Sequence, residues 1–126
     1  LHDALPIYDA WFYSGIAGIN PDTENPGFEN IIFKPYLTQY LDTAKASHNS
    51  GFGRIKSEWV RSKNELTWKI EIPENTTGQI YVPVYDKEVD IYLNGKETAV
   101  KDKHNGFCLI GNYNSGEYLI EVIELK

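Results

Sequence analysis

The feature that most constrains the fold is a strict alternation of apolar and polar residues over positions 66–72. The apolar members, which would share one face of a strand, are Leu66, Trp68, Ile70 and Ile72. A period of two predicts a β-strand with one dry face and one wet face. Strands of a parallel sheet are apolar on both faces, so this pattern favours an antiparallel sheet.

Short segments of the same texture follow one another after Phe28. The predicted strands lie at 31–34, 40–48, 54–61, 66–72, 79–85, 89–93, 97–100, 106–110 and 118–125. Turn signals separate them, and Asn94-Gly95 is the preferred dipeptide of a two-residue hairpin. The sequence therefore predicts a mainly β protein, an antiparallel β-sandwich of the jelly-roll or Greek-key type.

One amphipathic α-helix is predicted ahead of the strands, over residues 6–17. Pro6 suits its first turn and Gly18 suits its C-terminal cap. An isolated helix of this length is marginal in water, so it must pack on the rest of the chain or on a missing domain. Its apolar stripe, at spacings of three and four, comprises Ile7, Tyr8, Trp11, Phe12, Gly15, Ile16 and Ile19.

The segment GINPDTENPGF, residues 18–28, separates the helix from the strands. Its two prolines and two glycines give the backbone one particular path, which is typical of a structural corner. Asp22 and Glu24 within it are interpreted as acceptors for backbone N–H groups of the turns, and not as catalytic groups.

Composition limits the classes of function. The 126 residues, 41% of them hydrophobic, suffice for one domain with a core. The net charge of −6 and the scattered lysines and arginines leave no basic stripe, so no nucleic-acid partner is expected. No apolar run approaches the roughly 18 residues of a membrane span, so no membrane partner is expected. The chain has no methionine and no signal segment, and we expect it to be a piece of something longer.

Few residues could carry chemistry. The three histidines, His2, His48 and His104, are far apart and have no metal-ligand spacing. His48 and His104 are interpreted as exposed or locally hydrogen-bonded, and Cys108, in an apolar run, as a buried inert thiol. We therefore expect no catalytic residue, no metal site and no cofactor in this chain.

The aromatic residues have two interpretations. Most fall on apolar strand positions, which favours core and interface packing. They could instead stack on sugar rings if several coplanar rings were exposed on one face. The residues concerned are Tyr36, Tyr40, Trp59, Trp68, Tyr81, Tyr85, Tyr92 and Tyr113.

Several short pieces, in a specific order between residues 8 and 85, resemble a known family. They are Trp11-Phe12-Tyr13, Ile16-Ala17-Gly18-Ile19, Pro21-Asp22, Pro26-Gly27-Phe28, Ile31, Pro35, Ala44-Lys45-Ala46, Ser50-Gly51-Phe52-Gly53-Arg54-Ile55, Ser57-Glu58-Trp59 and Ile72-Pro73-Glu74-Asn75-Thr76. Together they resemble the C-terminal region of bacterial α-L-rhamnosidases of glycoside hydrolase family 78. The resemblance implies that residues 1–28 are the terminal helix and corner of a missing (α/α)6 catalytic barrel. Residues 29–126 would then form the C-terminal β-sandwich domain.

The resemblance also implies a function for the intact enzyme. Enzymes of this family hydrolyse terminal α-L-rhamnose with inversion, using an acid carboxylate and a base carboxylate from the barrel. Both would precede this chain, so the chain alone is expected to be inactive and to buttress the barrel. Its partners would be the catalytic barrel and, for the intact enzyme, rhamnose-containing glycosides. A homodimer through the uncovered helix face is a further expectation.

His2 is the candidate substrate-binding residue. The family commonly has an Asn-His-Tyr-Ala-x-Gly segment before the helix, and its histidine lines the rhamnose pocket. His2 and Ala4 fall in that register ahead of Trp11, whereas Asp3 and Pro6 depart from it. The alternative is a terminal residue without a role in the site.

Two other functions and the compartment remain open. The chain could be a free-standing carbohydrate-binding module, or a structural sandwich without a ligand; exposure of the aromatic side chains separates the two. The bacterial cytoplasm, the periplasm and the exterior all fit, because the targeting signal would lie outside this chain.

Overall fold

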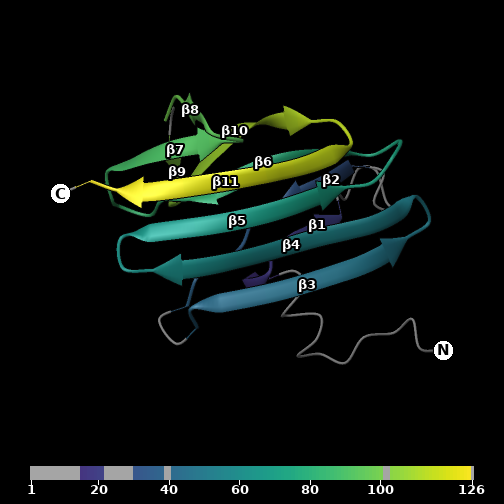
Figure 1. The fold of residues 1–126 in the computed structure, drawn as a ribbon, viewed down its shortest axis with the longest axis horizontal. Helices are drawn as coiled ribbons and strands as arrows, with labels where there is room; N and C mark the ends of the chain where they lie inside the picture. The colour runs from purple at the N-terminus through teal and green to yellow at the C-terminus, as the bar shows by residue number, and fades with distance from the viewer. Residues whose placement is uncertain (1–14, 22–29, 39–40, 101–102, 126) are drawn as a thin grey trace.

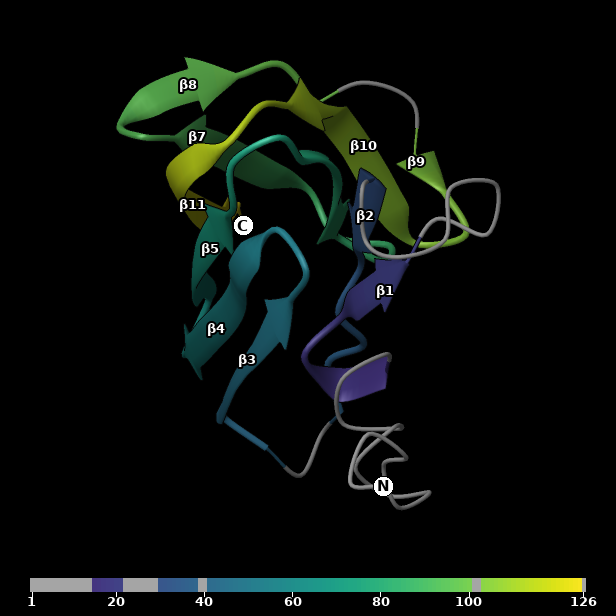
Figure 2. The same ribbon diagram turned by 90° about the vertical axis from the view of Figure 1, so that its right-hand side faces the viewer.

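The computed structural model describes residues 15–21, 30–38, 41–100 and 103–125 of the chain. These residues form eleven β-strands in two sheets, which pack as two layers (Figures 1 and 2). The five-stranded sheet has the order β1-β2-β6-β10-β9, and the six-stranded sheet has the order β3-β4-β5-β11-β7-β8. The strands are β1 (Ile19–Pro21), β2 (Asn30–Phe33), β3 (Thr43–Ser50), β4 (Gly53–Ser62), β5 (Glu65–Ile72), β6 (Thr77–Pro83), β7 (Val89–Leu93), β8 (Lys96–Thr98), β9 (Lys103–His104), β10 (Phe107–Tyr113) and β11 (Gly116–Glu124).

The inner faces of the two sheets enclose one hydrophobic core. The predicted dry face of β5 is confirmed, because none of its four apolar side chains is more than 4% exposed. Trp59 of β4, Trp68 of β5 and Phe33 of β2 are the largest side chains that the core buries completely. The fold is therefore mainly β and two-layered, as the alternation predicts.

The strand directions depart from the prediction at one place. All neighbouring strands run antiparallel except β2 and β6, which pair in parallel from Asn30 opposite Thr77 to Phe33 opposite Ile80. Between them the chain crosses to the other sheet and forms β3, β4 and β5 before it returns. The prediction of purely antiparallel pairing is wrong here. The sequence of a strand indicates which of its faces is buried, but it does not indicate the direction of the strand that pairs with it.

The helix predicted over residues 6–17 lies outside the described residues, apart from its last three positions. There the prediction is wrong: Gly15 and Ile16 have π-helical geometry, and the described residues contain no α-helix. The carbonyl groups of this segment bond to the sandwich, which draws the chain into the core. Within the described ranges, no helix is long and apolar enough to cross a membrane.

Two short strands appear where the sequence predicts turns. β1 occupies the start of the predicted corner and pairs with β2, and β9 contains His104. The predicted hairpin at Asn94-Gly95 is confirmed, since the two residues join β7 to β8 with φ values of 50° and 84°. Both values are positive, as a type I′ turn requires.

Candidate functional site: the anchor of the incoming chain

The most distinctive polar cluster surrounds the incoming segment, which we define as residues 15–18. Gly15, Ala17 and Gly18 are buried, and Ile16 is half-buried. A buried stretch of irregular backbone must find partners for its carbonyl groups. All four carbonyl groups of the incoming segment accept a hydrogen bond.

Side chains of the six-stranded sheet bind the middle two carbonyl groups. Trp59 Nε1 donates to the carbonyl oxygen of Ile16 at 2.8 Å, and Ser57 Oγ donates to that of Ala17 at 2.6 Å. Trp68 Nε1 in turn donates to Ser57 Oγ at 2.9 Å. Ser57 therefore links a carbonyl group of the incoming segment to an indole of the core, and all three side chains are 0% exposed.

Backbone groups that follow β2 bind the outer two carbonyl groups. Lys34 N donates to the carbonyl oxygen of Gly18, and Tyr36 N to that of Gly15, both at 2.9 Å. Since β2 belongs to the five-stranded sheet, the incoming segment is bonded to both layers of the sandwich. We call Ser57, Trp59 and Trp68, together with the incoming segment, the anchor.

The local sequence explains how the anchor forms. Alternation along β4 turns Ile55, Ser57 and Trp59 to the core, and the small serine leaves room for the incoming backbone. Gly18 has a φ of +80°, and a β-carbon there would lie 2.4 Å from Pro35 N. Only glycine satisfies both conditions. Among the described residues, every buried side-chain nitrogen and oxygen atom has a hydrogen-bond partner.

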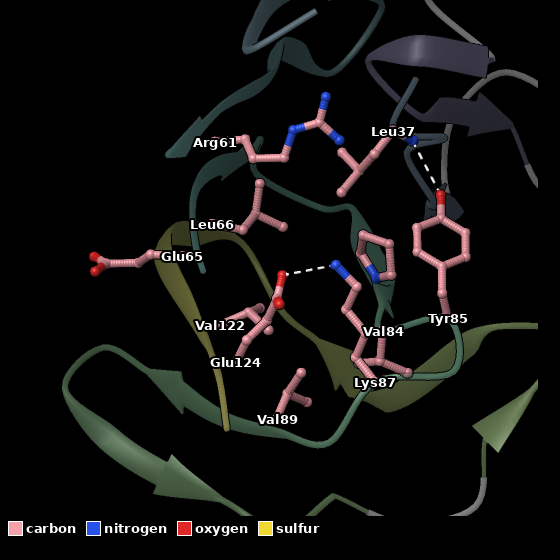
Figure 3. Close-up of a pocket in the computed structure, with 11 residues that line it drawn as sticks. Leu37, Arg61, Glu65, Leu66, Val84, Tyr85, Lys87, Val89, Val122 and Glu124 are labelled. Atoms are coloured by element: carbon pink, nitrogen blue, oxygen red, sulfur yellow. Dashed lines mark hydrogen bonds and ion pairs between the residues drawn. The ribbon is translucent and has the colours of Figure 1, made fainter. Parts of the chain in front are cut away.

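A small cavity of about 80 Å³ opens between the layers (Figure 3). Leu37, Leu66, Val84, Val89 and Val122 supply apolar lining. On its rim, Lys87 Nζ and Glu124 Oε2 form an ion pair at 3.0 Å. The cavity is well below the roughly 300–1,000 Å³ of typical ligand pockets. It has room for a small apolar group and not for an oligosaccharide.

The outer face of the six-stranded sheet is mostly polar, although Val60 and Ile123 are exposed on it. A shallow hollow of about 300 Å³ there is lined by Lys56, Lys69, Glu71 and Glu117, among others. Glu71 pairs with Arg54 Nε at 3.4 Å, and Lys56 lies 4.0 Å from Glu58. These carboxylates lie on an open sheet face beside cations. The arrangement is that of a solvated face and not of an acid and a base held in a cleft.

One tyrosine near this hollow has a shifted pKa. The ring of Tyr113 packs against that of Tyr118, with centroids 5.2 Å apart. Burial, and secondly the nearby Tyr118, raises the pKa of Tyr113 above its usual value of 10.0. The phenol is therefore protonated at neutral pH, and its hydroxyl donates to the carbonyl oxygen of Ile110 at 3.1 Å.

The residues singled out from the sequence do not converge on one site. His2, Asp22 and Glu24 lie outside the described residues. Cys108 is buried, as predicted, and His104 is exposed on β9. Within the part of the chain that the structure describes, no three histidine, cysteine or acidic residues gather as metal ligands.

Sequence reasoning missed the role of Ser57. A signal was present, because this serine occupies a core-facing position of β4 between Ile55 and Trp59, where a polar side chain needs a buried hydrogen-bond partner.

The two tryptophans of the anchor do not support the interpretation of the aromatic residues as a sugar-stacking surface. Trp59 and Trp68 are fully buried, so neither is available for stacking on a sugar.

Comparisons with known proteins agree with this architecture. Residues 18–97 match the family described as the bacterial alpha-L-rhamnosidase C-terminal domain. An alpha-L-rhamnosidase of an Alteromonas species is 29% identical over 122 residues, which are 97% of this chain and 12% of that protein. One from Formosa agariphila is 27% identical over 117 residues, or 90% of this chain and 12% of that protein.

Solved structures show the same fold. The alpha-L-rhamnosidase from Dictyoglumus thermophilum superposes with a TM-score of 0.83 at 28% identity, over 92% of this chain and 13% of that one. The Streptomyces avermitilis alpha-L-rhamnosidase superposes with a TM-score of 0.73 at 20% identity, over 88% of this chain and 10% of that one. The chain thus spans about one eighth of the relatives that it matches. With the match over residues 18–97, this chain belongs to the family of bacterial α-L-rhamnosidase C-terminal domains.

Proposed function

We propose that this chain is the non-catalytic C-terminal domain of an α-L-rhamnosidase, and that it packs against the catalytic barrel and stabilises it. One observation carries the proposal: 97% of the chain aligns with only 12% of a much longer alpha-L-rhamnosidase. A piece of this size corresponds to one domain of such an enzyme.

The anchor supports a structural role. Four hydrogen bonds to consecutive carbonyl groups fix the backbone where it enters the sandwich. A domain joined in this way keeps a defined orientation at its junction, because the incoming segment cannot swing without breaking bonds to both layers. A domain that stabilises the catalytic barrel by packing against it needs such a rigid attachment.

The chain ahead of Gly15 is, in this proposal, the last helix of an (α/α)6 barrel, and the corner up to residue 28 joins the barrel to the sandwich. Ile19–Pro21 of that corner already pair within the five-stranded sheet. The intact enzyme would hydrolyse terminal α-L-rhamnose with inversion, using two carboxylates from the barrel. A homodimer through the helix face is the arrangement that we propose for the domain when the barrel is absent.

An aryl α-L-rhamnoside assay tests the proposal on this chain and on the full-length protein that carries it. We expect turnover by the full-length protein only, and no heat when L-rhamnose is titrated into the chain alone. In the full-length protein, Ser57→Ala should lower the temperature of inactivation while kcat at 25 °C is retained; Ser62→Ala, an exposed position of the same strand, is the control. Turnover by the chain alone, or none by the full-length protein, would overturn the proposal.

A further inference from the structure

The outer face of the five-stranded sheet carries a second, smaller cluster. We define the outer aromatic patch as Lys34, Tyr36, Tyr81, Tyr85, Phe107 and Leu109. Cys108 and Val82 lie opposite each other in register and both point into the core. Because side chains alternate along a strand, Phe107 and Leu109 of β10 point to the other face. In Figure 2 this sheet is the right-hand layer.

The rings of the outer aromatic patch touch one another. Tyr36 and Tyr85 both pack edge-on against Phe107, with centroid distances of 5.3 Å and 5.9 Å. Lys34 Nζ lies 4.8 Å from the centroid of Phe107 and 5.2 Å from that of Tyr81. Phe107 is only 3% exposed, whereas Tyr36, Tyr85 and Leu109 are 42%, 37% and 44% exposed. The patch is thus an apolar cluster that remains half open.

Tyr85 has an unusual backbone conformation, with a φ of 52°. In the described part of the chain, the other non-glycine residues with positive φ are all asparagines, a type that tolerates this region. A tyrosine there is strained, and such strain persists only where the surroundings enforce it, often at functional sites. The amides of Val84 and Tyr85 both donate to the carbonyl oxygen of Gly106, and Leu37 N donates to the Tyr85 hydroxyl.

The patch also contains one cation, Lys34. Among the described residues, no carboxylate lies within ion-pair distance of Lys34 Nζ. On the outer face of the six-stranded sheet, by contrast, Arg54 and Lys56 both have acidic partners. A surface that fits the outer aromatic patch would therefore combine apolar side chains with a carboxylate.

The incoming segment indicates where such a surface comes from. Tyr36, a member of the patch, donates its backbone N–H to Gly15, the first described residue. The described chain therefore begins beside the patch, and the relatives carry most of their length outside the region that this chain matches.

We propose that the outer aromatic patch is the surface on which the preceding domain of the same polypeptide packs, with a carboxylate of that domain facing Lys34. This inference rests on the proposed function. Sugar stacking is disfavoured, because Lys34 already covers the rings of Tyr81 and Phe107 and because Phe107, at 3% exposed, offers no open ring face.

Hydroxyl-radical footprinting, read by mass spectrometry, tests this surface in the chain alone and in the full-length protein. We expect oxidation of Tyr36, Tyr85 and Leu109 to be about fivefold slower in the full-length protein, since an interface core excludes water. Val60 and Ile123, which are 49% and 38% exposed on the six-stranded sheet, are internal controls and should react equally in both.

A charge reversal sharpens the test. In the full-length protein, Lys34→Glu would place a second negative charge opposite the proposed carboxylate, and the repulsion would loosen the interface. The oxidation rate of Tyr36 and Tyr85 should therefore rise about threefold. Lys69→Glu, on the outer face of the other sheet, is the matched control and should leave these rates unchanged. Circular dichroism of both variants in the chain alone checks that the sandwich is intact.

Three outcomes would overturn the inference: equal rates in the two proteins, protection of Val60 and Ile123 instead, or slower oxidation of Tyr36 and Tyr85 when L-rhamnose is added to the chain alone. The last would assign the patch to a sugar. A full-length protein that protects the patch but lacks rhamnosidase activity would refute the proposed function and leave this inference standing.

Discussion

The anchor and the rim of the cavity hold polar groups in opposite ways. In the anchor, Ser57, Trp59 and Trp68 are completely buried and each polar atom has a partner. On the rim, Lys87 and Glu124 form an ion pair, although their side chains are 54% and 32% exposed to solvent. Both regions look well bonded, but only one of them is shielded from water.

This difference decides how much each region contributes to stability. Removing one partner of a buried hydrogen bond leaves the other unsatisfied, at about 1–3 kcal/mol for each group. An exposed ion pair competes with water and salt and contributes about 0–1 kcal/mol. We therefore expect stability to depend on the anchor and hardly at all on the rim.

The largest effect is expected at Gly18. Gly18→Ala would place a β-carbon 2.4 Å from Pro35 N at a φ of +80°, and should cost more than about 4 kcal/mol of unfolding free energy. Gly51→Ala is the matched control, because nothing lies within 4 Å of a β-carbon there. Urea denaturation followed by circular dichroism measures both. Similar stabilities for the two variants would show that the incoming segment is not fixed as described.

Ser57→Ala should have the next largest effect. It leaves the carbonyl oxygen of Ala17 and Trp68 Nε1 without their partner, which should cost about 2–4 kcal/mol. Ser62→Ala, at an exposed position of β4, should stay within about 0.5 kcal/mol of the parent. The same denaturation experiment compares them, and an equal loss in both would remove the energetic distinction between the anchor and the surface.

The smallest effect is expected at the rim. Lys87→Gln breaks the pair with Glu124 but leaves both groups in contact with water, so the unfolding free energy should fall by less than about 0.5 kcal/mol. Sodium chloride at high concentration should reduce even this difference, because it screens exposed charges. A loss as large as that of Ser57→Ala would contradict the comparison.

Local sequence patterns predict much of this fold. The alternation in β5 correctly assigns its inner face, and Asn94-Gly95 correctly locates a hairpin, because both signals are contained within a few residues. The parallel pairing of β2 with β6 could not be predicted in the same way, since nothing in the sequence of either strand identifies the strand with which it pairs. β1 is three residues long and ends in a proline, which hides it among turn residues.

The anchor shows the same limit within the site. The serine at a core-facing position of β4, Ser57, indicates a buried polar group. The carbonyl oxygen that accepts its hydrogen bond belongs to Ala17, which lies 40 positions earlier in the chain. The prediction of a stiff corner over 18–28 rests on its prolines and glycines. In the described part of that corner, Gly18 meets the steric demand, and side chains of a distant strand supply half of the bonds to the incoming segment.

The parallel pair β2–β6 has a consequence for the order of assembly. Asn30 and Thr77, which open the ladder, are 47 positions apart. At a translation rate of roughly 5–20 residues per second, β6 leaves the ribosome about 2–10 s after β2. During that interval Ile31 and Phe33 have no strand beside them on that edge, whereas β3, β4 and β5 can already pair as consecutive hairpins. We therefore expect the six-stranded sheet to begin forming first and the five-stranded sheet to close late, with the slow kinetics of non-local strand pairing.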